Sequence, residues 1–365
     1  MMEYLKTVNH DLQGVRKLIL EGPTSINYIS TSGFSLFRDI CVIIYEANKV
    51  LKDSGIIQAD LPNMEVIKEV RHKVKTNQGI KNREIFNKLL KGHKSIFGDD
   101  IDNLGFYLDG ENLAGSTLFP TFVFADTPLQ NSRDEDTHRG FSSEVGALIQ
   151  LIIDWINHPI DLESKPLKVY NTEEYSTKDI WDRVFFTEDT TYNVFVTRIL
   201  LIQNELTTCI WMEDHLDYKS SILNLDKYIL LRLTSIKLFE VMRNILDVRK
   251  RLGQHWEKLN YSALDNLIEE YTKTLQVEMK VLRDMLHYNN NGINFYDYVT
   301  QQLITNPQYA DDLLDIMFKD YIIPLRKAIS GNINIESYKS MSDFEKILRR
   351  SRTKLFNKSQ RKEHI

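Results

Sequence analysis

Arg283 and His287 are the two residues of this chain whose types and spacing could support chemistry. They lie four residues apart in a stretch with the apolar pattern of one helix, Leu264 to Tyr288. On one helix the two side chains would converge over a single turn, at the edge of the apolar stripe. Such a pair could cleave RNA without a metal ion: the histidine would move protons, and the arginine would stabilise charge on the phosphate.

This chemistry predicts a dimer. Acid and base roles usually need two groups, and a single helix supplies only one histidine. A symmetric dimer that pairs this helix with its copy would supply the second. Under this hypothesis the partners are RNA and a second copy of the chain.

The second half of the chain has the pattern of several long helices, which we expect to position the Arg283–His287 pair. Apolar residues recur at helical spacing over four segments, and short loops join the first three. We therefore predict an antiparallel helical bundle over residues 180–330. The four predicted helices run from Thr187 to about Leu216, from Leu225 to Leu252, from Leu264 to Tyr288, and from Tyr309 to Ser330 with a kink near Pro324.

The predicted third helix of this bundle ends in Arg283, Asp284, a short spacer, His287 and an aromatic residue. This arrangement resembles a HEPN domain, over roughly residues 185–330. The superfamily comprises helical domains of bacterial defence systems, toxins and CRISPR-associated ribonucleases. The resemblance implies an RNA-directed dimer, a metal-independent endoribonuclease with Arg283 and His287 as the catalytic pair and Asp284 as the residue that orients them. The family usually has four to six residues between the arginine and the histidine, whereas this chain has three.

The alternative is a non-catalytic helical interaction or scaffold protein. In that case Arg283 would pair with a nearby acid, and His287 would interact favourably with the C-terminal end of the helix. The same bundle would then serve dimerisation or partner binding. A catalytic pair should be accessible in a cleft at a two-fold axis, whereas a structural pair should be buried in ion pairs or spread over open surface.

The N-terminal half is predicted to be a separate helical domain, residues 1–165, with a small β insertion. Phe34 to Ser54 has a clear helical pattern, closed by Gly55. The segment from Gly105 to Ala125 is rich in aromatic and β-branched residues and contains an Asp-Gly turn signal, so we predict a β-hairpin there. The residues from Asp161 to Asp179 have the composition of a linker. The fold class is therefore mainly α.

Residues 331–365 form a predicted basic C-terminal helix or tail. Eight Lys or Arg and no acid occur between Lys346 and Lys362. This charge is typical either of a solvated helix end or of a contact with a phosphate backbone. In the second case the nucleic-acid-binding residues would be Arg349, Arg350, Arg352 and Lys354.

Four residues with metal-binding side chains lie close together in a polar stretch, Asp126 to Gly140, that we predict to be a loop. They are Asp134, Glu135, Asp136 and His138. Adjacent acids in a loop are more often solvated charge than ligands, and the chain has no phosphate-binding loop, dinucleotide motif or CxxC pair. We therefore expect no metal and no cofactor.

Composition places the chain among cytoplasmic globular proteins. Apolar residues make up 42% of its 365 residues and charged residues 27%. The net charge of −5 gives no overall attraction to nucleic acid or to an anionic membrane. The N-terminus lacks the apolar core of a signal peptide, and no run approaches the roughly 20 apolar residues that cross a bilayer. The two cysteines are expected to be buried thiols, and no membrane partner is expected.

Overall fold

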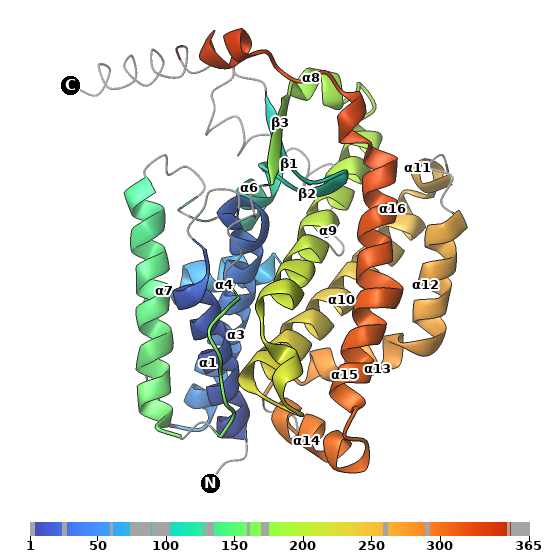
Figure 1. The fold of residues 1–365 in the computed structure, drawn as a ribbon. Helices are drawn as coiled ribbons and strands as arrows, with labels where there is room; N and C mark the ends of the chain where they lie inside the picture. Colours follow the sequence, from blue (N-terminus) through green and yellow to red (C-terminus); the bar gives the residue numbers. More distant parts are fainter. Residues whose placement is uncertain are drawn as a thin grey trace, which may run out of the picture.

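The computed structural model is mostly helical, with one small antiparallel sheet (Figure 1). It describes residues 4–23, 28–58, 61–73, 89, 103–125, 127, 129, 135–158, 161–168, 175–257, 262–288, 293–348 and 351. The predicted fold class, mainly α with a β insertion, is confirmed at this level.

Helices α9 (Thr190–His215) and α10 (Leu225–Arg251) form the centre of the molecule and pack along one another (Figure 1). Both begin at a side-chain cap, since Asp189 accepts hydrogen bonds from the first-turn amides of α9 and Asn224 accepts one from the first turn of α10. Most of their residues are buried, including many polar ones, which therefore need internal partners. The predicted ranges of these helices are confirmed.

The N-terminal helices cover one side of this pair. α1 packs between α7 and α10, and the close approach depends on Gly14: a Cβ atom there would lie 2.7 Å from Ile229 of α10. α3 packs against α4 and also contacts α1 and α9. These helices span Tyr4–Glu21 (α1), Phe34–Asp53 (α3), Met64–His72 (α4) and Glu135–Ile156 (α7), with the π-helix η1 at Ile29–Gly33.

The sheet lies at one end of the helices and has the strand order β2-β1-β3, all antiparallel. β1 (Leu104–Asp109) and β2 (Asn112–Ser116) form the predicted hairpin, and Gly110 takes the left-handed conformation at its turn. Two predictions are corrected. The hairpin ends at Ser116, and the apolar residues that follow form helix α6 (Leu118–Phe124). The predicted linker supplies the third strand, β3 (Ser176–Ile180), which pairs with β1.

The stretch from Leu264 to Tyr288 is two helices and a turn, so the prediction of one continuous helix is wrong. α12 (Ser262–Thr274) and α13 (Gln276–Asp284) meet at Leu275. The hydroxyls of Thr272 and Thr274 bind carbonyls four residues back, and such bonds bend helices. The apolar stripe itself is confirmed: Leu267 is half-buried, and its other members are buried, namely Leu264, Ile268, Tyr271, Leu275, Met279, Leu282 and Leu286.

The last helices cover the other side of the central pair. α16 packs along α9, and α14 and α15 lie at the end opposite the sheet. The predicted kink near Pro324 corresponds to a π-helix, η4 (Ile316–Ile322), immediately before α16. The remaining elements are α8 (Asp182–Phe185), η3 (Tyr218–Ser220), α11 (Gly253–Glu257), α14 (Phe295–Thr305), α15 (Tyr309–Asp315), α16 (Ile323–Ile333) and η5 (Ile335–Ser337).

The buried apolar side chains of both predicted domains belong to one continuous cluster. Val8 and Leu12 of α1, for example, share it with Tyr228 and Ile229 of α10. The division into residues 1–165 and 180–330 stays a prediction. Within the described ranges, no helix has the length and apolar content needed to cross a membrane.

Candidate functional site

Arg283 lies in the last turn of α13 and binds two carboxylates. Its Nε and Nη2 atoms lie 3.2 Å from Oε1 of Glu240 on α10, and its Nη1 lies 2.9 Å from Oδ1 of Asp284. The Arg283 side chain is only 13% exposed, whereas that of Asp284 is 44% exposed. The positive charge of the Arg283 guanidinium is therefore balanced within the fold by the carboxylates of Glu240 and Asp284.

His287 lies beyond the end of α13, in a turn, and binds an acid of the N-terminal half. Its Nδ1 is 2.9 Å from Oε2 of Glu46 on α3, and Glu46 also forms an ion pair with Arg71 of α4. Burial alone would raise the pKa of Glu46, but the hydrogen bond from His287 and the charge of Arg71 outweigh it, so this pKa is below its ordinary value. Glu46 is a buried anion that ties the turn to α3 and α4.

Helix α13 ends at Asp284 because the side chains of the residues that follow are buried in the core. Leu286 and Tyr288 are buried, and the Tyr288 hydroxyl donates to Asp11 of α1 at 2.7 Å. Arg232 of α10 donates to the carbonyls of Leu282 and Met285 and so satisfies this helix end. The predicted stacking of Arg283 and His287 over one helical turn is therefore replaced by contacts to separate carboxylates.

Asp11 and Arg232 form a fully buried ion pair between α1 and α10, 2.9 Å apart. The hydroxyls of Tyr228 and Tyr288 also donate to the Asp11 carboxylate. Burial, together with the neighbouring charge of Asp11, raises the pKa of both tyrosines well above the ordinary value, so they remain neutral donors. This cluster joins α1, α10 and the turn after α13.

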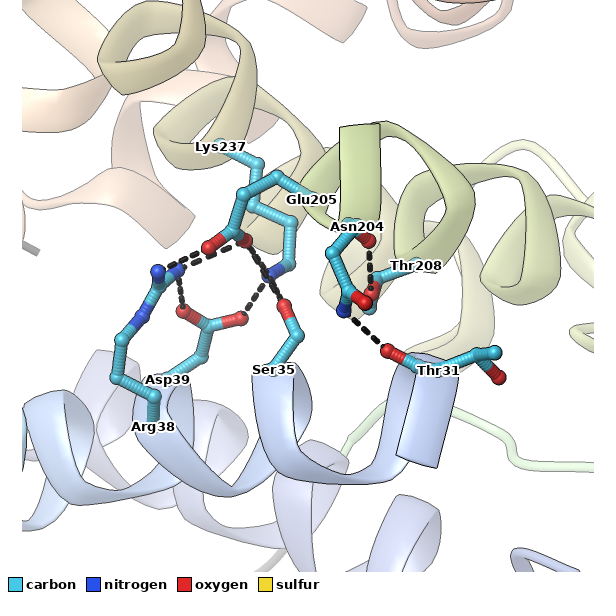
Figure 2. A network of polar contacts seen from close by, with 8 residues as sticks. All are labelled: Thr31, Ser35, Arg38, Asp39, Asn204, Glu205, Thr208 and Lys237. Atoms are coloured by element: carbon cyan, nitrogen blue, oxygen red, sulfur yellow. Dashed lines mark hydrogen bonds and ion pairs between the residues drawn. The ribbon is translucent and has the colours of Figure 1, made fainter. Parts of the chain in front are cut away.

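A second buried cluster joins α3, α9 and α10 (Figure 2). Lys237 lies 2.8 Å from Glu205, 2.5 Å from Asp39 and 2.6 Å from the Ser35 hydroxyl. Arg38 binds both Asp39 and Glu205, and Ser35 donates to Glu205 at 2.8 Å. Two acids thus balance two bases, and each of the five residues is at least 92% buried.

Figure 2 shows Lys237 beside Ser35. A neutral lysine in this position could take the proton of the serine hydroxyl and make it a nucleophile. The carboxylates of Asp39 and Glu205 keep Lys237 protonated and so oppose this role. Burial alone would lower the pKa of Lys237, yet Asp39 and Glu205 raise it above the ordinary value. Arg38 and Lys237 outweigh the effect of burial on Glu205 and lower its pKa to about 2. Lys237 is therefore a charged donor that cannot accept the Ser35 proton, and the cluster is structural.

A small cavity of about 20 Å³ lies between this cluster and Glu240. It has room for about one water molecule and is too small for a nucleotide. Among the residues that the structure describes, Glu240 Oε2 and Asn244 Oδ1, both from residues that line the cavity, have no hydrogen-bond partner. Burial raises the pKa of Glu240 despite the opposing charges of Arg283 and Arg243.

A wider, open hollow of about 350 Å³ lies between α3 and α4. Tyr45, Lys49 and Lys68 are among the residues that line it, and neither Arg283 nor His287 is one of them. The pair predicted from the sequence thus borders neither this hollow nor the small cavity beside Glu240.

Several predicted site residues lie outside the described part of the chain. These are the basic residues Arg349, Arg350, Arg352 and Lys354, and the side chains of Asp134, Glu135, Asp136 and His138. The backbone from Glu135 onward is the start of α7, so that part of the predicted loop is helical. Over the residues that can be described, no three His, Cys, Asp or Glu side chains gather as a metal-binding group.

The buried charges at Asp11, Glu46, Glu205, Arg232 and Lys237 were missed by the sequence analysis. Their signal is a charged residue inside an otherwise apolar helical stretch, as in the run ILLRLTSIKLF around Arg232 and Lys237. Charges are rarely buried without partners, so such residues mark internal ion pairs. The pattern does not reveal which acid pairs with which base.

Comparison with known proteins gives no match for this chain, whether against family models, curated proteins or solved structures.

Proposed function

We propose that this chain is a non-catalytic helical interaction protein. The observation that carries the proposal is the engagement of Arg283 and His287 by separate internal carboxylates, Glu240 and Glu46. A ribonuclease pair would need to face one scissile phosphate together, with donors free to bind its oxygens. Here the Arg283 and His287 side chains hold the end of α13 against α10 and α3.

The interaction surface that we assign to this function is the outer face of α13, and its partner is a second copy of the chain. Val277 is 76% exposed and Val281 37% exposed, one turn apart on this face. Met279 and Leu282, on the opposite face, are buried. A two-fold pairing of α13 with its copy would remove both valines from water.

The competing hypothesis is the one implied by the HEPN resemblance, an RNA-directed dimeric endoribonuclease in a defence or toxin system. It requires a bundle of HEPN type over residues 180–330 and an accessible catalytic pair. His287, whose side chain is 32% exposed, is the member of the pair that solvent reaches more easily. Both hypotheses involve a dimer, so activity and assembly must be measured separately.

The test of activity is incubation of the full chain with mixed single-stranded RNA in EDTA, beside His287→Ala. We expect no cleavage by either protein and a lower melting temperature for the variant, because Glu46 loses one partner. Cleavage by the wild type that disappears in His287→Ala would overturn the proposal in favour of the ribonuclease.

The test of assembly is light scattering coupled to gel filtration. We expect a dimer for the wild type and a monomer for Val277→Glu with Val281→Glu. The matched control is Ile304→Glu on α14, a site that is 84% exposed and should leave assembly unchanged. A wild-type monomer would contradict the assigned surface, and a dimer that persists in the double variant would place the interface elsewhere.

A further inference from the structure

Residues 161–168 form a strap, without helix or strand, that lies along α1 (Figure 1). Its backbone closes the ends of the two central helices. The amide of Leu225, the first residue of α10, donates to the carbonyl of Glu163 at 2.8 Å. The amide of Lys168 donates to the carbonyl of His215, the last residue of α9, also at 2.8 Å. The strap therefore satisfies backbone groups that a helix end leaves without a partner.

His10 of α1 binds the beginning of the strap. Its Nε2 lies 2.9 Å from Oδ1 of Asp161, and its ring stacks on that of Tyr296 of α14, with the ring centroids 4.6 Å apart. Lys6, one turn earlier on α1, binds the other carboxylate oxygen of Asp161 at 2.5 Å. The His10 side chain is 0% exposed, whereas that of Asp161 is 48% exposed. A buried imidazole is thus joined to a carboxylate at the surface.

The other ring nitrogen of His10, Nδ1, is buried and accepts no hydrogen bond from any residue that the structure describes. Because Nε2 faces a carboxylate, the neutral ring carries its proton on Nε2 and donates it to Asp161, which leaves a lone pair on Nδ1. Protonation of Nδ1 would place a new N–H group and a positive charge inside the protein without an acceptor. The attached strap therefore favours the neutral form of His10.

The charged and titratable side chains around the His10 ring come from α1, the strap, α10 and α14: Lys6, Asp11, Asp161, Tyr228 and Tyr296. Burial has the largest effect and lowers the pKa of His10. The charge of Lys6 also lowers it, whereas Asp161 and Asp11 raise it, and Asp11 is already paired with Arg232. The pKa of each tyrosine is above its ordinary value, so both remain neutral. On balance the pKa of His10 lies below its ordinary value of 6.5.

We infer that the strap is a pH-sensitive device, attached to α1 near neutral pH and released at its Asp161 end as acid protonates His10. Once the strap opens, water reaches the His10 ring and can bind the N–H group of the protonated Nδ1. The open form therefore binds a proton more tightly than the attached form does. The contribution of His10 to attachment is present above its ordinary pKa of 6.5, and it is lost as the pH falls from there toward the lower pKa of the attached form. This pH response does not depend on the function proposed for α13.

The experiment is amide hydrogen exchange of the full chain at about pH 7 and about pH 5, with the rates corrected for the intrinsic effect of pH on exchange. The reporters are the amides of Leu225 and Lys168, because their acceptors are backbone carbonyls, which do not titrate. We expect the protection of both amides to fall by about tenfold between the two pH values. In His10→Gln a neutral amide replaces the imidazole, so protection should not depend on pH. The matched control is His255→Gln, at a buried histidine of α11 beside Asp189, and it should respond to pH as the wild type does.

An NMR titration of the histidine ring nitrogens in the wild type tests the same device without a variant, in case His10→Gln does not fold. The neutral His10 ring should carry its proton on Nε2, and its titration midpoint should lie below 6.5. A midpoint above that value would overturn the inference, and so would protection of the two amides that is equal at both pH values in the wild type. Protection that still falls with pH in His10→Gln would also overturn it, because a different group would then be the one that titrates.

Discussion

His287 and Glu46, 241 residues apart in the chain, bind one another at 2.9 Å. Glu46 is buried on α3, and its second carboxylate oxygen binds Arg71 of α4. A carboxylate that binds an arginine and a histidine is well compensated for its loss of water. The contact therefore fixes the turn after α13 against the N-terminal helices, and it gives His287 a structural role.

Glu46→Gln should lower the free energy of unfolding by about 2 kcal/mol near neutral pH, because Arg71 and His287 lose their shared anion. The folded-state pKa of Glu46 is below its ordinary value of 4.5, so its contribution is present above that pH. It is lost as the pH falls through the folded-state pKa. Urea unfolding as a function of pH should show the two proteins converging in acid. Glu188→Gln, at an exposed site, is the control, and its free energy of unfolding should match that of the wild type. A difference in the free energy of unfolding between Glu46→Gln and the wild type that stays constant at all pH values would contradict the structural role of Glu46.

Lys237→Met should destabilise the protein by about 3–5 kcal/mol, since Asp39 and Glu205 would then share only Arg38. Glu205→Leu should cost a similar amount. The double variant keeps the balanced pair of Arg38 and Asp39, so it should lose less than the sum of the single variants by about 2 kcal/mol. Chemical unfolding of the four proteins measures this coupling. Additive losses would show that the two residues act independently.

Gly14→Ala should destabilise the protein by about 1–3 kcal/mol, because the new methyl group would lie 2.7 Å from Ile229. Gly146→Ala on α7 is the matched control: it is also a helical glycine, but a Cβ atom there meets nothing within 4 Å. Alanine should stabilise that site by about 0.5–1 kcal/mol. Thermal unfolding should therefore shift in opposite directions, and a neutral Gly14→Ala would contradict the close packing of α1 on α10.

Cys41 and Cys209 should be unreactive toward a thiol reagent in the folded protein. Both are free and buried, as the sequence analysis predicted. Burial raises the pKa of the Cys209 thiol to about 12 and that of Cys41 higher still, so little thiolate forms near neutral pH. A colorimetric assay should detect both thiols only after denaturation. Rapid reaction of either one in the native protein would show that its helix opens.

The sequence by itself determined the features that depend only on residues close to one another along the chain. The apolar stripe of Ile268, Met279 and Leu282 is buried as predicted, because helical periodicity depends only on residues three and four apart. The ranges of α9 and α10 and the hairpin turn at Gly110 follow from equally local signals. The local pattern also marked Arg283 and His287 as a cation and a titratable imidazole at the edge of a packed face.

The tertiary structure alone decided which residues Arg283 and His287 contact. The end of α13 at Asp284 depends on Leu286 and Tyr288 being drawn into the core, and Tyr288 finds its partner on α1. The partners of Arg283 and His287 come from α10 and α3, and the strand β3 from a segment with the composition of a linker. A buried charge needs an opposite charge within a few ångströms. Which residue supplies it depends on which helices pack together, and spacing along one helix carries no information about that.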